Sequence, residues 1–309
     1  MHRLHLRPLL RLASAATLLA LAAPGALAQS DAPLFTGHAP RGWYGLESST
    51  RPVLGWSYEN RTVAYTSTRQ TDRDGDNSGV DGSLSHFANY TTASWMSPWL
   101  IFGGNVVMAV TVPLQNSGQN PRGLAYGADG FGLGDVQLRP LQLYWPLERA
   151  TLSFAYSVWL PTGGFDATKT DNVGKGFLSH ELSFGWTHRP FADESWHYSV
   201  MSRMSFHGEV DKLDATPGDD LVVDWSAGKR LGGRWNAGLV GYGVFQTSRD
   251  DGVDANPGLG FYGLGAAGVE ARYEMPEWGG HAAFRVYQEF LAYNQPEGQL
   301  AVLELAFQL

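Results

Sequence analysis

The 309-residue chain contains no cysteine, so it has no disulfide, no thiolate nucleophile and no thiolate metal ligand. After residue 28 it has no run of 18 or more consecutive apolar residues, which excludes a transmembrane helix there. Basic residues number 22 against 30 acidic ones, a balance that argues against nucleic acid as a partner. A Gly-x-Ser-x-Gly nucleophile motif is absent, and the histidines show no metal-ligand spacing. We therefore expect no cofactor and no bound metal.

The first 28 residues have the composition of a secretory signal peptide. Three arginines precede an apolar stretch over residues 12–23, and Ala26-Leu27-Ala28 supplies a small-residue cleavage site. The alternative is an uncleaved membrane anchor, for which this apolar stretch is short. We expect cleavage after Ala28, which leaves 19 basic and 30 acidic residues and a formal charge of −11.

The residues that are abundant favour β-structure. Glycine (38 residues) and aromatic residues (13%) suit strands and sharp turns better than helices. In RATLSFAYSVWLPTGG (149–164), every second residue from Leu152 to Leu160 is large and apolar, and those between are mostly small. This is the period of a strand with two unlike faces. Twelve strand-like segments are predicted, at roughly 52–67, 83–96, 99–114, 132–145, 149–161, 177–189, 195–208, 220–231, 234–248, 259–274, 279–293 and 298–309.

The connections between these segments alternate in length. Long ones such as STRQTDRDGDNSGVDG are followed by short ones such as SP, PLE and LGG, and the last connection on the long side, NQPEG, is tight. A bacterial outer-membrane barrel has this pattern, with short periplasmic turns, long external loops and an even number of strands. We therefore predict an all-β, transmembrane, antiparallel up-and-down β-barrel of about 12 strands over residues 52–309. A secreted β-sandwich or a lipocalin-like barrel is the alternative.

Residues 29–51 precede the predicted barrel and have two interpretations. They form either a partial plug inside the lumen or a disordered periplasmic leader. Both ends of the mature chain are expected in the periplasm, and the barrel is expected to be a monomer in the bacterial outer membrane. The partners that follow are outer-membrane lipid and lipopolysaccharide, the barrel-assembly machinery and a small-molecule solute.

The strand faces that would not touch lipid carry nearly all of the charge in the middle of the strands. Neighbouring strands carry opposite charges there, which predicts ladders of ion pairs inside the lumen. The ladders either stiffen the barrel or form a polar constriction that orients solutes, and the two roles are compatible. The lumen-lining candidates are Glu59, Arg61, Glu181, Arg203, Asp224, Glu270, Arg272, Arg285, Glu289 and Glu304.

Two further patterns resemble functional sites but fit them poorly. TDRDGDNSGVDG (71–82) has the first aspartates of a calcium-binding loop, but Asn77 replaces the required glycine and no glutamate stands at position 12. An acidic external loop is the better interpretation, and divalent ions that bridge it to lipopolysaccharide are the alternative. His197 and Ser199 have the His-x-Ser spacing of outer-membrane lipid hydrolases, but their parity places them in the lumen, near the periplasmic end. Non-enzymatic function is therefore predicted.

Four stretches carry a family resemblance. GLGDVQLRP (132–140), WLPTGGFD (159–166), LVVDWSAGKRLGGRWNAGLVGYGVFQ (221–246) and the final strand after NQPEG resemble the MetA-pathway of phenol degradation family of bacterial outer-membrane proteins. The order and spacing match over most of the mature chain. The resemblance implies transporter-like uptake of hydrophobic or aromatic small molecules, and it implies no binding residues. The chain ends in Leu309 rather than the usual Phe or Trp, with Phe307 two residues earlier. The apolar alternation is kept, so we expect the assembly machinery to recognise this strand.

Together these patterns predict passage of small hydrophobic or aromatic compounds across the outer membrane. At about 12 strands the lumen lies between small filled barrels and open porins, which favours a narrow or plugged pore. Two alternatives remain, a structural or surface-interaction barrel without conduction and a lipid-modifying hydrolase.

Overall fold

The computed structural model describes residues 36–78, 84–116, 130–169, 172–255 and 260–309. The described residues form thirteen strands and one short 3-10 helix, η2 (Pro276–Trp278). Among these residues, no helix is long and apolar enough to cross a membrane. The strands are β1 (Gly55–Gln70), β2 (Leu84–Ile101), β3 (Gly104–Asn116), β4 (Phe131–Leu133), β5 (Val136–Pro146), β6 (Ala150–Leu160), β7 (Ser179–His188), β8 (Trp196–His207), β9 (Asp220–Gly232), β10 (Trp235–Gln246), β11 (Gly263–Met275), β12 (Gly280–Tyr293) and β13 (Pro296–Gln308).

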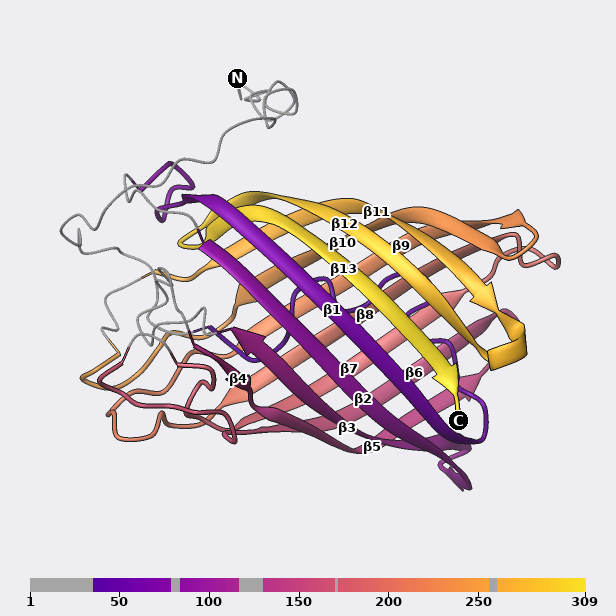
Figure 1. Ribbon diagram of the computed structural model, residues 1–309, viewed down its shortest axis with the longest axis horizontal. Helices are drawn as coiled ribbons and strands as arrows, with labels where there is room; N and C mark the ends of the chain where they lie inside the picture. Colours follow the sequence, from indigo (N-terminus) through magenta and orange to yellow (C-terminus); the bar gives the residue numbers. More distant parts are fainter. Residues whose placement is uncertain (1–35, 79–83, 117–129, 170–171, 256–259) are drawn as a thin grey trace, which may run out of the picture.

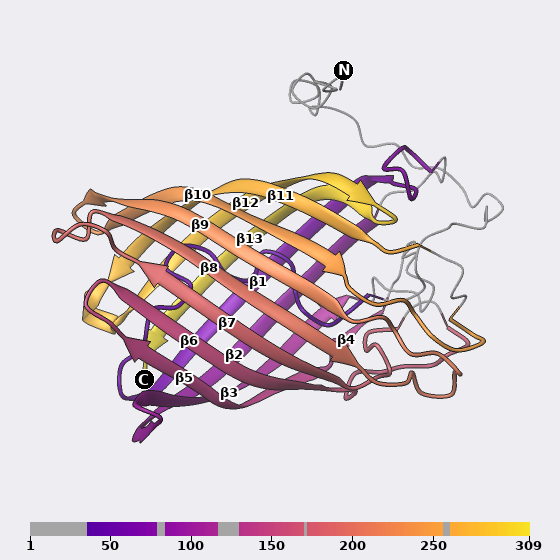
Figure 2. The ribbon, with the colours of Figure 1, turned by 180° about the vertical axis from the view of Figure 1, so that it is seen from behind.

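The strands close into a barrel. The strands pair antiparallel in chain order, except that β3 pairs with both β4 and β5, and β1 pairs with both β2 and β13, which joins the two ends of the sheet. Figures 1 and 2 show the tilted strands wrapping around one lumen. The short β4 pairs with β3 beyond the end of β5, so it lengthens the β5 position of the wall at the long-loop end. The barrel therefore has twelve strand positions around its circumference. The predicted all-β antiparallel barrel of about 12 strands is confirmed.

The two faces of each strand differ as the alternation predicted. In β6 the residues with odd numbers from Thr151 to Trp159 are buried, and those with even numbers from Leu152 to Leu160 are exposed or half-buried. Thr151, Ser153 and Ser157 therefore face the lumen, while the large apolar side chains face outward. A closed sheet leaves no unpaired strand edge, which is what a β-structure in hydrocarbon requires.

The turn expected at Ser97-Pro98 is wrong. β2 continues to Ile101, and the chain reverses at Phe102 and Gly103, both of which have positive φ (49° and 75°). The pairing of β2 with β3 shifts between Met96 and Leu100, so Pro98, which has no N–H to donate, lies in a bulge rather than in a turn. The β2–β3 hairpin consequently projects beyond the neighbouring short turns (Figure 1).

Residues 36–54, here called the inner segment, run through the barrel before β1 begins. At one end Nζ of Lys175, in the long β6–β7 loop, donates to the carbonyl of Thr36 (2.9 Å). At the other end Arg189, in the short β7–β8 turn, donates to the Thr50 hydroxyl (3.0 Å). The segment therefore spans the lumen from the long-loop end to the short-turn end, visible as the indigo trace inside the barrel in Figures 1 and 2. Thr36, the first described residue, and Leu309 lie at opposite ends of the lumen (Figure 1). The start of the mature chain, which is expected in the periplasm, lies outside the described residues.

Candidate functional site

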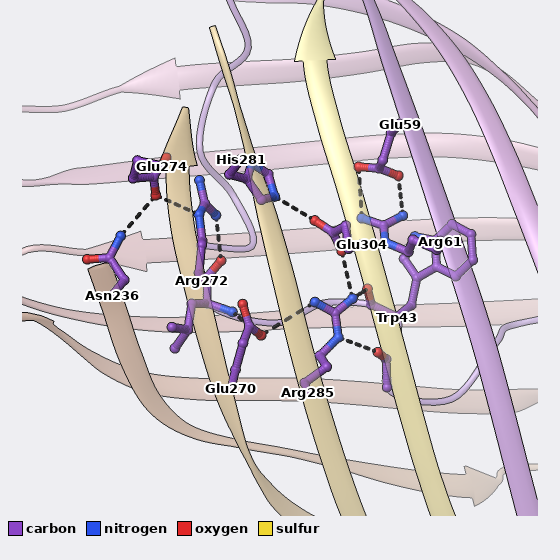
Figure 3. Close-up of polar contacts among 12 residues, drawn as sticks. Trp43, Glu59, Arg61, Asn236, Glu270, Arg272, Glu274, His281, Arg285 and Glu304 are labelled. Atoms are coloured by element: carbon purple, nitrogen blue, oxygen red, sulfur yellow. Dashed lines mark hydrogen bonds and ion pairs between the residues drawn. The ribbon is translucent and has the colours of Figure 1, made fainter. Parts of the chain in front are cut away.

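A cluster of buried charges lies on the lumen wall formed by β11, β12, β13 and β1 (Figure 3). Arg285 of β12 is at its centre, with Nη1 3.4 Å from Glu270 of β11 and Nη2 2.7 Å from Glu304 of β13. Nε of Arg61 in β1 lies 2.8 Å from Glu304, and its Nη2 donates to Glu59 (2.9 Å). The charges thus alternate in sign across four neighbouring strands, and we call these five residues the wall cluster.

The wall cluster also holds the backbone of the inner segment. Arg285 donates to the carbonyls of Gly42 (3.2 Å) and Trp43 (2.8 Å). Glu270 accepts the N–H of Leu46 (3.1 Å), so both partners of an ion pair bind the segment as well as each other. These bonds satisfy backbone groups that would otherwise be buried without partners. The cluster therefore has a defined structural task, which is to position the segment.

Gly45 shows how close this contact is. A Cβ built there would lie 1.7 Å from Oε2 of Glu270 and 2.7 Å from Nη1 of Arg285. Only glycine fits between the segment and these two buried side chains. In β1, the guanidinium carbon of Arg61 lies 4.3 Å from the centroid of the Trp43 ring, a cation–π contact.

The remaining lumen candidates belong to separate groups. Arg203 pairs with Asp224 (3.0 Å) and donates to the carbonyl of Pro40 (2.7 Å). Glu181 instead accepts from the indole N–H of Trp159 (3.3 Å). The structure therefore brings Arg203 and Asp224 together and gives Glu181 a different partner.

Glu289 and Arg272 also have partners outside the wall cluster. Glu289 pairs with Arg41 of the inner segment (2.9 Å) and accepts from two tyrosine hydroxyls, those of Tyr65 (2.8 Å) and Tyr242 (2.9 Å). Arg272 pairs with Glu274 on its own strand (2.7 Å) and donates to the Leu46 carbonyl (3.3 Å). All ten candidates lie on the lumen side, and five of them form the wall cluster: Glu59, Arg61, Glu270, Arg285 and Glu304.

At the short-turn end, the His-x-Ser pattern does not form a catalytic pair. The Ser199 hydroxyl bonds to Thr187 (2.9 Å), which in turn accepts the N–H of Ser49 (3.0 Å). The ring nitrogens of His197 have no hydrogen-bond partner among the described residues. Both side chains are buried and face inward, as their parity predicted, so they lie away from the lipid face.

At the long-loop end, five side chains form a continuous chain of contacts that we call the outer network. His38 of the inner segment lies between Asp135 (Nε2 to Oδ2, 3.0 Å) and the hydroxyl of Ser179 in β7 (Nδ1 to Oγ, 2.7 Å). The same hydroxyl bonds Nδ1 of His207 in β8 (2.7 Å), whose Nε2 lies 3.5 Å from Oδ2 of Asp220 in β9. Burial lowers the pKa of His38 to about 4, so its ring is neutral near neutral pH.

A cavity of about 190 Å³ opens beside the outer network, between the inner segment and the barrel wall. Aromatic side chains line much of it, from β1, β2, β6 and the β6–β7 loop: Tyr65, Tyr90, Trp159, Phe165 and Phe177. Its polar lining includes Arg41, Gln115 and Lys175. Burial lowers the pKa of Lys175 to about 8. The volume exceeds the roughly 150 Å³ of an apolar cavity that binds benzene, so a single-ring compound fits.

The described part of the acidic loop, residues 71–78, forms a turn. Oδ1 of Asp72 accepts the backbone N–H groups of Asp74 (3.0 Å) and Asp76 (2.9 Å), which closes a turn. Among the residues that the structure describes, no group of three or more His, Cys, Asp or Glu side chains is arranged to hold an ion.

Sequence reasoning missed the outer network and the cavity. His38 and Ser179 are 141 positions apart, and no local pattern relates them. The available signal was the composition of GHAPRGWYGLESS (37–49), in which two glycines flank the adjacent aromatic residues Trp43 and Tyr44. Gly42, Gly45 and the neighbouring Trp43 are the residues that let this stretch pack closely against the wall.

The profile of the family described as "Putative MetA-pathway of phenol degradation" matches residues 67–305. The chain belongs to this family. Among solved structures, the family member is similar to the COG4313 outer membrane channel from Pseudomonas putida F1, with a TM-score of 0.72 and 12% identity over 87% of this chain and 99% of that one. The Pseudomonas putida toluene transporter TodX matches with a TM-score of 0.41 and 10% identity over 90% of this chain and 94% of that one. No curated protein sequence matches the chain. The barrel is an outer-membrane barrel, as its fold and family indicate.

The lipid-facing assignment has a direct test in Phe184, which is 59% exposed in the middle of β7. We expect Phe184→Arg to lower the free energy of unfolding in lipid by about 2–4 kcal/mol, because the charge would enter hydrocarbon. Phe102→Arg is the matched control, since Phe102 is 91% exposed at the tip of the projecting β2–β3 hairpin. Urea titration in vesicles measures both variants, and equal effects would contradict the assignment.

Proposed function

We propose that the family member allows passive, non-enzymatic passage of small hydrophobic or aromatic compounds across the outer membrane. The observation that carries the proposal is the aromatic-lined cavity at the long-loop end of the lumen, where an external solute would enter. Its size suits a single ring, and its polar groups suit a solute with one hydrogen-bonding substituent. Family membership agrees with this substrate class.

The inner segment acts in this proposal as a partial plug, positioned by the wall cluster below the cavity. Residues 1–28 serve as the cleaved signal peptide, and residues 52–309 as the barrel. Outer-membrane lipid and lipopolysaccharide surround the barrel, the assembly machinery inserts it, and it works as a monomer. In this arrangement the lumen does not conduct as an open pore, and a solute passes only when the inner segment moves aside.

Reconstitution in liposomes tests the proposal. We expect swelling several-fold faster than in protein-free liposomes with single-ring aromatic acids, and slow swelling with sugars. Protein-free liposomes correct for solutes that cross the lipid unaided. If no solute increases the swelling rate, passage is refuted. The alternative, a structural barrel without conduction, would then stand, favoured by the inner segment that spans the lumen.

A further inference from the structure

The inner segment carries one buried carboxylate, that of Glu47, at the short-turn end of the lumen. Its Oε1 lies 3.0 Å from Nη2 of Arg189, in the β7–β8 turn, and 3.3 Å from Nη2 of Arg230, in β9. Nε of Arg189 donates to the same oxygen (3.1 Å), and Arg272 of β11 adds a third positive charge nearby. A carboxylate of the segment therefore occupies a place whose cations all belong to the barrel.

The two arginines that bind Glu47 depend on it to different extents. Arg230 also pairs with Glu194 in the β7–β8 turn (2.9 Å), where both side chains are about half exposed. Arg189 is 15% exposed, and among the described acidic residues Glu47 is its only ion-pair partner. A largely buried arginine that loses its only anion is unfavourable, so another carboxylate is the natural substitute for Glu47.

His197 of β8 supplies an unused hydrogen-bonding group beside the same place. Its side chain is fully buried, and neither ring nitrogen has a partner among the described residues. The ring and the side chain of Leu46 lie together, since a Cβ built on Gly228 would be 2.1 Å from Cε1 of His197 and 2.7 Å from Cδ2 of Leu46. Burying a ring nitrogen without a partner is unfavourable, so this histidine indicates a ligand next to Glu47.

The backbone of Glu47 is held in a strained conformation. Its φ is 56°, in the left-handed region that residues other than glycine seldom adopt. Its carbonyl accepts the N–H of Thr50 (2.9 Å), which closes a turn. The ion pairs of Glu47 thus maintain a turn that is unfavourable by itself, and a competitor for the arginines would release it.

We propose that Arg189 and Arg230 form a carboxylate-binding site that the inner segment occupies with its own Glu47, and that an aromatic carboxylate replaces Glu47 there. The exchange leaves no buried arginine without an anion, and the N–H of His197 becomes available to the incoming carboxylate. Displacement of Glu47 frees the inner end of the segment at the short-turn end of the lumen. This opening step rests on the proposed function, whereas the binding site does not.

Equilibrium dialysis of the folded barrel with benzoate tests the site. Glu47→Gln retains the shape of the side chain but removes the competing charge, so we expect it to bind benzoate about tenfold more tightly than the parent chain. Arg189→Gln should abolish binding. Benzamide, which has the same ring without the charge, should bind to none of these chains.

Glu277→Gln is the matched control for Glu47→Gln. Glu277 pairs with Arg234 at the same end of the barrel (2.6 Å), so its replacement removes a charge of the same sign outside the inner segment. It should leave the affinity for benzoate unchanged. Equal affinities of Glu47→Gln and the parent chain overturn the proposal, as does benzoate binding that persists in Arg189→Gln.

The absence of cysteine makes the displacement measurable by single-cysteine labelling. Ser49 is fully buried two residues after Glu47, so Ser49→Cys should react slowly with a water-soluble maleimide. Val253→Cys, at an 83% exposed loop position, reports any direct effect of a solute on the reaction. We expect saturating benzoate to raise the ratio of the two rates about tenfold and benzamide to leave it unchanged.

Equal effects of benzoate and benzamide on this ratio overturn the displacement. The heat-dependent gel mobility of folded barrels shows that each variant is assembled, and if Ser49→Cys fails to fold, dialysis alone decides. Neither assay requires a solute to cross the membrane. Competition between benzoate and Glu47 in a barrel that passes no solute would refute the proposed function alone. Swelling without this competition would refute only the inference.

Discussion

Arg285→Ala is expected to destabilise the barrel by about 3–5 kcal/mol, the cost of removing one partner from a buried ion pair. Arg285 is 1% exposed, and its loss leaves Glu270 and Glu304 without their shared cation. The carbonyls of Gly42 and Trp43 lose their donor at the same time. Urea-induced unfolding in lipid vesicles, followed by tryptophan fluorescence, measures the change.

Arg234→Ala is the matched control for this experiment. Arg234 pairs with Glu277 at the barrel rim, and both side chains are about half exposed. An exposed pair of this kind contributes at most about 1 kcal/mol. Similar losses for the two variants would show that the wall cluster does not stabilise the barrel as argued.

Gly45→Val is expected to displace the inner segment and to raise conductance. The new side chain would overlap Glu270 and Arg285, and overpacking of this kind costs about 1–3 kcal/mol. Because we expect the inner segment to move rather than the barrel wall, this energy shifts the equilibrium toward a state in which the segment has left its position against the wall, by about 5- to 150-fold. Single-channel recording in planar bilayers measures the open fraction.

Gly164→Ala provides the control, because a Cβ at Gly164 meets nothing within 4 Å and its φ is not positive. It should leave both conductance and stability unchanged. If Gly45→Val also leaves conductance unchanged while the protein folds, the inner segment does not limit passage, and the plug hypothesis fails.

The strands and their faces could be predicted because the signals are local. The alternation from Leu152 to Leu160 depends only on neighbouring residues, and it assigned the lipid and lumen faces of β6 correctly. Pro98 was misread for the same reason. A Ser-Pro pair is typical of a turn, and only the pairing of β2 with β3 reveals that a bulge absorbs it.

The sequence by itself determined that this chain is an exported, closed antiparallel barrel, because a period of two, alternating loop lengths and the lack of apolar helices leave few other folds. It also placed the wall charges on lumen-facing positions. Their partners depended on tertiary structure. The register of four strands around a closed barrel brings Arg285 to Glu270 and Glu304, and the path of the inner segment decides that these charges bind a backbone as well as each other. The outer network and the cavity arise from the same path, since contacts across 141 residues follow from closure of the barrel and from no local pattern.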